Sequence, residues 1–369
     1  MKTTYDPSIF DPNSSFSVGL ELEVRLVKEE TFAPSNSSKY IFEHLPSHLK
    51  DNVHKELLQS MIEIVTPVSK SAKEAVDFLD MALRDIAKVA KKEGIYLAAL
   101  ATHPFERKED NEIVHDPRYE AFEQELQIVL KNFLISGLHI HVGMPNEDAA
   151  IRCYQAAIKY MPIFIALSAN SPFHLGEDTG LQSYRNKIFE RLPRAGIPEF
   201  FSSYKEYCSL IDQLFITNTI QSVKDVWWDV RIHQKFGTIE LRVCDAFFDF
   251  ERIKLLVQLF RSLMAYAYDR DFKREFYQIY KQNKWNAIRH DLNGNFIEGS
   301  NVSTIKEKTI SLIEDIQKAG IFKDLFKEKS IEELYNLLEE KVLSQQAREI
   351  YNQTKDFTKV IEPHIVKGE

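Results

Sequence analysis

Strict alternation of apolar and polar residues predicts that the stretch from Phe16 to Leu26 is a half-buried strand. The even-numbered side chains are all apolar and share one face, while Glu21, Glu23 and Arg25 share the other. Two carboxylates at this spacing on one strand face lie roughly 7 Å apart, close enough to hold a common ion or ion cluster.

The same alternation recurs further along the chain. The stretch from Gly137 to Met144 places His139 and His141 on one face and aliphatic side chains on the other. The stretch from Leu58 to Thr66 carries Glu63 and ends at a proline, which favours a strand that stops there. The residues from 95 to 100 suit a further strand.

Two alternating stretches joined by four residues, 226–232 and 237–245, are typical of a β-hairpin. Asp229 and Arg231 are expected to share a face on the first strand, and Glu240 and Arg242 on the second. The open faces of these strands therefore collect acidic, histidine and arginine side chains from distant parts of the sequence.

Helical spacing of apolar residues predicts the other layer. Ser71 and Glu74 form a capping box, and the helix that follows should stop at Gly94 and cover the apolar face of the sheet. Residues 149–169 are expected to be helical, 170–194 irregular, and 250–282 and 303–369 mostly helical.

Composition narrows the function classes. The chain has 369 residues, 44% of them hydrophobic and 28% charged, which is ordinary for a folded, soluble protein with a large core. A net charge of −8 argues against non-specific nucleic-acid binding. The three cysteines form no CxxC pair, and neither a signal peptide nor a membrane-spanning apolar run is present, so a cytoplasmic protein with no membrane association is expected.

Placed together, the polar strand faces point to divalent cations and phosphate. Two carboxylates 4 Å apart repel by roughly 4 kcal/mol at an effective dielectric of about 20, so several glutamates on one concave surface need cations. Carboxylates with one imidazole suit Mg²⁺ or Mn²⁺, and arginines suit phosphate or carboxylate. Phosphoryl transfer uses both kinds of group. The chain has no GxxxxGK[ST] and no GxGxxG motif, so ATP would have to be held by the metals and the sheet.

Each motif taken alone also suits a plain structural explanation. Glu21 and Glu23 fit the solvated face of an edge strand, and the two histidines fit surface or core positions. Glu240 and Arg242 fit ordinary cross-strand ion pairs. It is the set of strand faces, rather than any one of them, that favours a functional site.

Seven motifs in this order resemble those of the bacterial carboxylate–amine ligases, the second family of glutamate–cysteine ligases. They are GLELE at 19–23, EIVTP at 63–67, GLHIHVG at 137–143, SANSP at 168–172, DTG at 178–180, SYR at 183–185 and GTIELR at 237–242. The resemblance covers roughly residues 16–270.

The resemblance implies an α+β fold of the glutamine-synthetase-like kind. In it, a curved antiparallel β-sheet has helices packed on its outer face and ATP and metals on the inner face. We expect a single catalytic domain over residues 1–369, in which 300–369 form a mostly helical C-terminal extension.

The resemblance also implies the reaction and the residues that serve it. An amino-acid carboxylate, typically the γ-carboxylate of glutamate, attacks the γ-phosphorus of ATP, and an amine captures the acyl phosphate as an amide. The implied metal shell for Mg²⁺ or Mn²⁺ is Glu21, Glu23, Glu63, His139 and Glu240. Arg242 and Arg231 resemble arginines that contact the nucleotide phosphates, and Arg185 resembles one for a substrate carboxylate.

Two other functions stay open at this point. A kinase on the same fold would phosphorylate a guanidine or a carboxylate and stop there. A nucleotide- or amino-acid-binding protein without turnover would use the same face for recognition alone. The partners expected in each case are small molecules, and exposed sheet edges would allow a homodimer.

Overall fold

A computed structural model describes residues 10–14, 16–321 and 328–368 of the chain. Its main element is an eight-stranded antiparallel sheet in which six strands follow the order β10-β11-β5-β1-β3-β2 and β4 pairs with both β1 and β14. The strands are β1 (Val18–Lys28), β2 (Val53–Lys55), β3 (Met61–Val65), β4 (Ile95–Ala98), β5 (Gly137–Gly143), β10 (Val230–His233), β11 (Thr238–Asp245) and β14 (Ile365–Val366).

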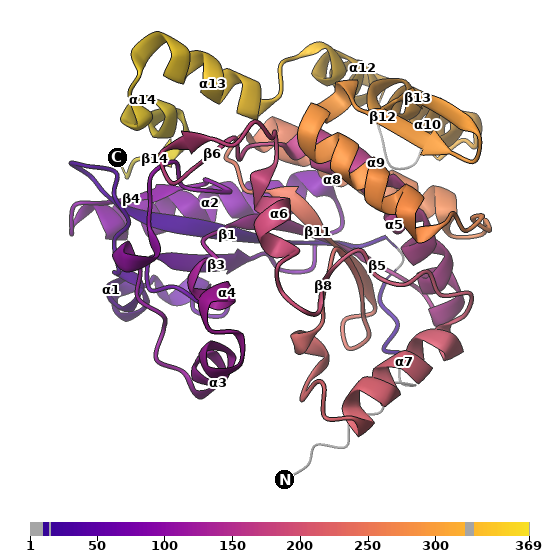
Figure 1. Cartoon of the computed structure of the whole chain (residues 1–369), viewed down its shortest axis with the longest axis horizontal. Helices are drawn as coiled ribbons and strands as arrows, with labels where there is room; N and C mark the ends of the chain where they lie inside the picture. The colour runs from indigo at the N-terminus through magenta and orange to yellow at the C-terminus, as the bar shows by residue number, and fades with distance from the viewer. Residues whose placement is uncertain (1–9, 15, 322–327, 369) are drawn as a thin grey trace.

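The long strand β1 crosses the middle of the molecule (Figure 1) and organises the sheet. Its alternating sequence buries Leu20, Leu22 and Val24 completely on one face, as expected for a strand that packs on helices. Its first half pairs with β5 and its second half with β4, while β3 lies along the other edge. The strand therefore brings three partners into one register.

Three long helices cover the apolar face: α2 (Ala72–Lys91), α5 (Glu147–Ser168) and α8 (Phe250–Ala267). Helix α2 begins where the sequence predicts, because the hydroxyl of Ser71 accepts a hydrogen bond from the Glu74 amide. The Glu74 carboxylate accepts from the amide of Lys70 and not from that of the cap residue. Pro162 lies inside α5, which continues through it to Ser168.

Smaller elements surround this two-layer body. The helices are α1 (Ser38–His44), α3 (Pro117–Leu126), α4 (Ile128–Lys131), α6 (Tyr184–Phe189), α7 (Tyr204–Ile216), α9 (Tyr277–His290), α10 (Ile305–Lys318), α12 (Glu328–Glu339), α13 (Leu343–Thr354) and α14 (Phe357–Ile361). Short strand pairs are β6 (Phe173–His174) with β7 (Glu177–Asp178), β8 (Ala195–Gly196) with β9 (Trp227–Trp228), and β12 (Asn295–Glu298) with β13 (Asn301–Thr304).

The fold class expected from the sequence is confirmed: an antiparallel sheet carries its helices on one face and leaves the other face free for polar groups. Most of the expected strands are present, with ends that differ from the expected ones by at most three residues. Across the described parts of the chain, no helix combines the length and the apolar character needed to cross a bilayer.

One expected strand is wrong. The stretch 226–232 is not continuous, because it breaks at Asp229 into β9 and β10. The side chain of Asp229 is 1% exposed and its Oδ2 accepts a hydrogen bond from Nζ of Lys284 at 2.6 Å. Asp229 is thus engaged in a buried ion pair with Lys284, whereas Arg231 pairs with Glu240.

Candidate active site

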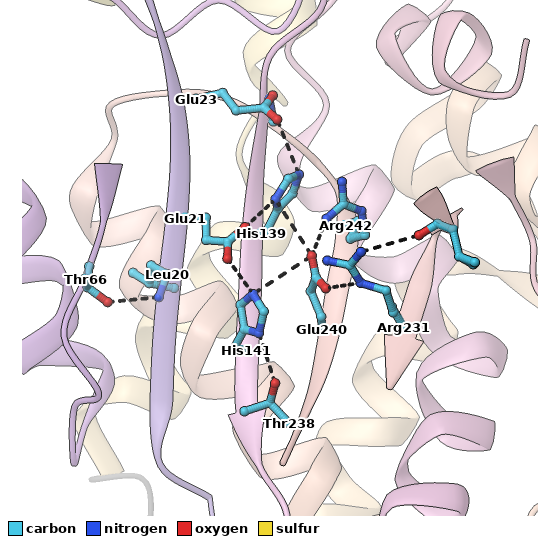
Figure 2. A network of polar contacts seen from close by, with 12 residues as sticks. Leu20, Glu21, Glu23, Thr66, His139, His141, Arg231, Thr238, Glu240 and Arg242 are labelled. Atoms are coloured by element: carbon cyan, nitrogen blue, oxygen red, sulfur yellow. Dashed lines mark hydrogen bonds and ion pairs between the residues drawn. The ribbon is translucent and has the colours of Figure 1, made fainter. Parts of the chain in front are cut away.

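The register of the sheet brings the acidic and histidine residues of three strands side by side. Glu21 on β1 lies opposite His139 on β5, and His141 lies opposite Glu240 on β11. The carboxylate of Glu21 bridges the two imidazoles, with its Oε2 at 3.1 Å from Nδ1 of His139 and its Oε1 at 3.1 Å from Nε2 of His141. Figure 2 shows this arrangement between the strands.

Two arginines hold Glu240 from the other side. Nε of Arg231 on β10 donates to Oε2 of Glu240 at 2.6 Å, and Arg242 forms an ion pair with Oε1 (Figure 2). The side chain of Glu240 is 0% exposed, whereas the sequence pattern places it on the open face. It is on that face, but the two arginines cover it. We call Glu21, His139, His141 and Glu240 the central group.

A second set of carboxylates lies further along the same face, on the side of β3. Glu23 on β1 is directly opposite Glu63 on β3, and Glu56 follows β2, the neighbour of β3. Oε2 of Glu23 accepts a hydrogen bond from the amide of Gly137 at 2.5 Å, and Oε1 of Glu23 lies 3.7 Å from Nε2 of His139. We call Glu23, Glu56 and Glu63 the lateral group.

Neighbouring charges determine the protonation of the central group. Burial would raise the pKa of Glu21, but the charge of His141 and hydrogen bonds with both histidines hold it well below its usual value. Burial likewise opposes ionisation of Glu240, and the two arginines outweigh it and lower the pKa of that carboxyl. Burial and the charge of Arg242 lower the pKa of His139. The acids of this group are thus held as carboxylates.

In the lateral group, the surroundings of Glu56 and Glu63 raise the pKa values of these carboxyls instead of lowering them. Burial and the neighbouring charge of Glu23 raise the pKa of Glu56 to about 8. Burial and the charges of Glu21 and Glu56 raise the pKa of Glu63 well above its usual value. Within the described residues, no lysine or arginine forms an ion pair with Glu56 or Glu63. The charge of Arg242 offsets only part of this effect, so the described residues leave the group short of positive charge.

Both groups open into a cavity of about 470 Å³. Its lining includes the acidic residues Glu21, Glu23, Glu56 and Glu63, the arginines Arg118, Arg185, Arg231 and Arg242, and the aromatic residues Tyr119, Phe122, Phe133, Phe189, Trp227 and Phe236. A second cavity of about 430 Å³ shares Glu21, Val65 and Phe236 with it and is also lined by His141. Glu21 therefore stands where two cavities meet.

Arg185 enters the main cavity from α6. Its side chain is 1% exposed, and its Nη1 donates to the carbonyl of Arg242 at 3.0 Å. A Cβ at position 137 would collide with the guanidinium, so Gly137 is required for the arginine to reach this place. Its Nε has no hydrogen-bond partner in the protein. A buried donor of this kind can receive a substrate oxygen.

The residues present fit divalent cations. Two sets of ligand atoms lie within 4.8 Å of one another: Glu21, His139 and Glu240, and Glu23, Glu63 and His139. Nε2 of His139 is buried without a hydrogen-bond partner, and Nε2 of His141 faces the carboxylate of Glu21 at 3.1 Å. Carboxylates combined with imidazole suit Mg²⁺ and Mn²⁺. All five residues expected as metal ligands thus meet at one place, while their occupancy by metal stays a prediction.

The sequence pattern did not predict Glu56 or the aromatic residues that line the cavity, which we call the aromatic wall. Glu56 follows a strand of only three residues, too short to show an alternating pattern. Tyr119 and Phe122 come from helix α3, whose sequence has no metal or phosphate motif. A signal did exist for Glu56, since it precedes Glu63 by seven residues across a tight strand pair.

The fold itself is that of known ligases. A glutamate–cysteine ligase of Francisella tularensis, solved in complex with AMP, superimposes with a TM-score of 0.72 at 13% identity, over 96% of this chain and 89% of that one. A bifunctional glutathione synthetase of Pasteurella multocida gives 0.65 at 16% identity, over 94% of this chain and 49% of that one.

Sequence comparison gives the family. The model of glutamate–cysteine ligase family 2 matches residues 17–361, and the chain belongs to this family. A relative from Solibacter usitatus named "Putative glutamate–cysteine ligase 2" is 31% identical over 96% of this chain and 94% of its own. One with the same name from Roseiflexus castenholzii is 29% identical over 99% of this chain and 97% of its own. The chain is therefore a glutamate–cysteine ligase-like enzyme.

Proposed function

We propose that this protein is an ATP- and Mg²⁺-dependent carboxylate–amine ligase that forms an amide through an acyl phosphate. The observation that carries the proposal is the meeting of carboxylates, imidazoles and arginines from five strands in one cavity. The family, and the AMP bound to the related ligase of Francisella tularensis, support ATP as the nucleotide.

The proposed reaction has two steps. In the first, a carboxylate oxygen of the acid substrate attacks the γ-phosphorus of ATP, the bond to the bridging oxygen breaks, and ADP leaves. In the second, the amine nitrogen attacks the acyl carbon, phosphate leaves with the electron pair of the C–O bond, and the nitrogen loses a proton. We propose glutamate as the acid, and the family name suggests cysteine among the amines to test first.

The two carboxylate groups have matching roles in this scheme. Glu21, His139 and Glu240 would hold one cation, and Glu23 and Glu63, with His139 between the groups, would hold another. Divalent cations bound there would supply positive charge for the phosphates of the nucleotide. Glu56 adjoins Glu23 and Glu63, and we include it in the lateral site.

The arginines would bind the negatively charged groups that take part in the reaction. Arg242 and Arg231 are fixed by Glu240 and line the main cavity, where a guanidinium can stabilise the transferring phosphoryl group. Arg185, with its unpaired Nε, would bind a carboxylate of the acid substrate. The protein needs no base at the phosphorus, because a carboxylate nucleophile carries no proton to remove.

The arrangement of the cavities supports two reactants. The main cavity and the second cavity meet at Glu21, so molecules entering from the two sides would come together at the central group. We propose that residues 1–369 act as one catalytic domain.

Release of ADP, measured while amino acids and amines are varied, tests the proposal. We expect release that requires Mg²⁺ and a carboxylate substrate, and mass spectrometry should show an amide. A phosphorylated product without amide would instead favour a kinase. Nucleotide binding without any carboxylate-dependent release, across the tested pairs, would contradict ligation.

A further inference from the structure

Helix α13, near the C-terminus, forms several hydrogen bonds with the segment that leads to Arg185. Arg348 on α13 forms a fork with Asp178, in which Nε lies 2.9 Å from Oδ2 and Nη2 lies 2.9 Å from Oδ1. The same guanidinium donates from Nη2 to the carbonyl of Leu181 at 2.6 Å and from Nη1 to Oε1 of Gln182 at 2.7 Å. One guanidinium thus donates hydrogen bonds to three residues of one loop.

Further contacts fix the same helix to the same loop. The hydroxyl of Ser344 donates to Oε1 of Gln182 at 2.7 Å, and the Ser344 amide donates to the carbonyl of Ala169 at 3.0 Å. Phe173 of β6 packs against the rings of Tyr351 and Phe357, which stack on each other, with centroid distances of 5.2 Å and 5.3 Å. Figure 1 shows α13 and α14, in yellow, beside β6.

The far end of this loop enters the active site. The hydroxyls of Ser171 and Ser183 both donate to the buried carboxylate of Asp245, at 2.7 Å and 2.8 Å. The Ser171 hydroxyl in turn accepts from the amide of Arg185 at 3.0 Å. Because Ser171 and Ser183 also form a parallel bridge, the loop closes on itself directly before Arg185.

We propose that Arg348 is a positioning residue for Arg185. The C-terminal segment then supports the acid-substrate site. The inference rests on the proposed function of Arg185 in binding a substrate carboxylate. It gives a role to the DTG motif at 178–180, whose aspartate touches Arg348 and does not line the main cavity.

The fork is the essential part of the contact. Asp178 is 46% exposed and Arg348 is 18% exposed, and a single exposed ion pair would hold the loop weakly. A planar guanidinium that also reaches Leu181 and Gln182 fixes orientation as well as distance. A lysine at position 348 keeps the charge but cannot make these contacts together, so the two variants Arg348→Ala and Arg348→Lys should behave alike.

Steady-state kinetics on the full chain provide the first test. We expect Arg348→Ala, Arg348→Lys and Asp178→Asn each to raise the KM for the acid about tenfold, because small misplacement of a binding group is costly. The KM for ATP should stay within about twofold, since the proposed nucleotide contacts do not involve this loop. The double variant Arg348→Ala/Asp178→Asn should raise the KM for the acid no more than either single variant does. Arg84→Ala, which removes an exposed ion pair on α2, is the matched control.

Hydrogen exchange provides a second test that does not depend on turnover. The variants at positions 348 and 178 should speed exchange in peptides covering 176–189 and leave the strands of the sheet unchanged, whereas Arg84→Ala should change neither. Faster exchange with no change in the KM for the acid would overturn the positioning role. Unchanged exchange in that loop would show that Arg348 and Asp178 do not hold the loop in place. If the wild-type protein shows no carboxylate-dependent ADP release, the proposed function fails. The exchange result still decides whether Arg348 and Asp178 hold the loop in place.

Discussion

The central and lateral groups lie on one face of one sheet, yet they differ in charge balance. Glu240 and Glu21 are surrounded by two arginines and two histidines, which favour the ionised acids. Glu56 and Glu63 have mainly other carboxylates for neighbours, and their pKa values are raised. The cause is position: the arginines are on β10 and β11, and β5 and β1 separate those strands from β3.

The difference shows that two cation sites made of the same residue types can be prepared differently. The central group is stable as it is, because its carboxylates already have positive partners. The lateral group stores repulsion that a bound cation would remove. The comparison therefore predicts that mutations in the two groups change stability in opposite directions.

The largest effect is expected for Glu240→Gln. This change leaves Arg231 and Arg242 without their shared carboxylate and removes a proposed metal ligand, so ligase activity should fall by about 10³-fold or more. Because the ion pairs are buried, unfolding should also become easier by about 3 kcal/mol. Activity assays and chemical denaturation measure the two changes.

Stability should fall because Glu240, although on the open face of the sheet, is covered by Arg231 and Arg242. Glu314→Gln, which removes an exposed i,i+4 pair with Lys318, is the control and should change neither quantity measurably. A Glu240→Gln protein as stable as the wild type would contradict the burial of this charge network.

Arg242→Lys should reduce activity by about 10²-fold, because a point charge cannot reproduce the planar fork at the phosphoryl group. The lysine keeps the charge beside Glu240, so stability should fall much less than in Glu240→Gln. Comparison of kcat with the KM for ATP shows whether the loss is in turnover, as we expect. Arg84→Lys controls for the substitution itself.

Glu63→Gln should separate the two groups most directly. At pH 8, without metal, it removes a carboxylate whose pKa is raised in the folded protein, and the melting temperature should rise by about 1 to 3 °C. Addition of Mg²⁺ should then stabilise this variant less than the wild type. Equal stabilisation of both proteins by Mg²⁺ would show that the lateral group binds no cation.

Outside both groups, a buried histidine should affect stability alone, through its dependence on pH. His103 is buried beside Arg25, and burial, followed by that positive charge, lowers its pKa to about 3. The unfolded chain therefore takes up a proton at higher pH than the folded one. The stability due to neutral His103 is complete above about pH 6.5 and is lost as pH falls toward 3.

His103→Asn should flatten this part of the stability profile. Between about pH 6.5 and 4.5 the wild type should lose roughly 2 to 3 kcal/mol more than the variant, which denaturation at several pH values measures. A slope unaffected by the change at 103 would contradict the lowered pKa.

Individual elements show how far the sequence alone could lead. The alternation in β1 and β5 was enough to place Glu21, Glu23, His139 and His141 on one face, because strand geometry has a period of two. The same rule failed at Asp229, where the strand is interrupted and the carboxylate pairs with Lys284 from a distant helix. The aromatic wall and Glu56 gave no periodic signal.

The sequence by itself determined the class of fold, the open polar face and the five residues expected to bind metal, since each depends on local periodicity or on short motifs. The tertiary structure alone decided how charge is distributed between the two groups and that Arg348 reaches the loop before Arg185. Ion pairing and burial depend on contacts between residues far apart in the chain, such as Arg348 and Asp178, and no local pattern encodes these distances.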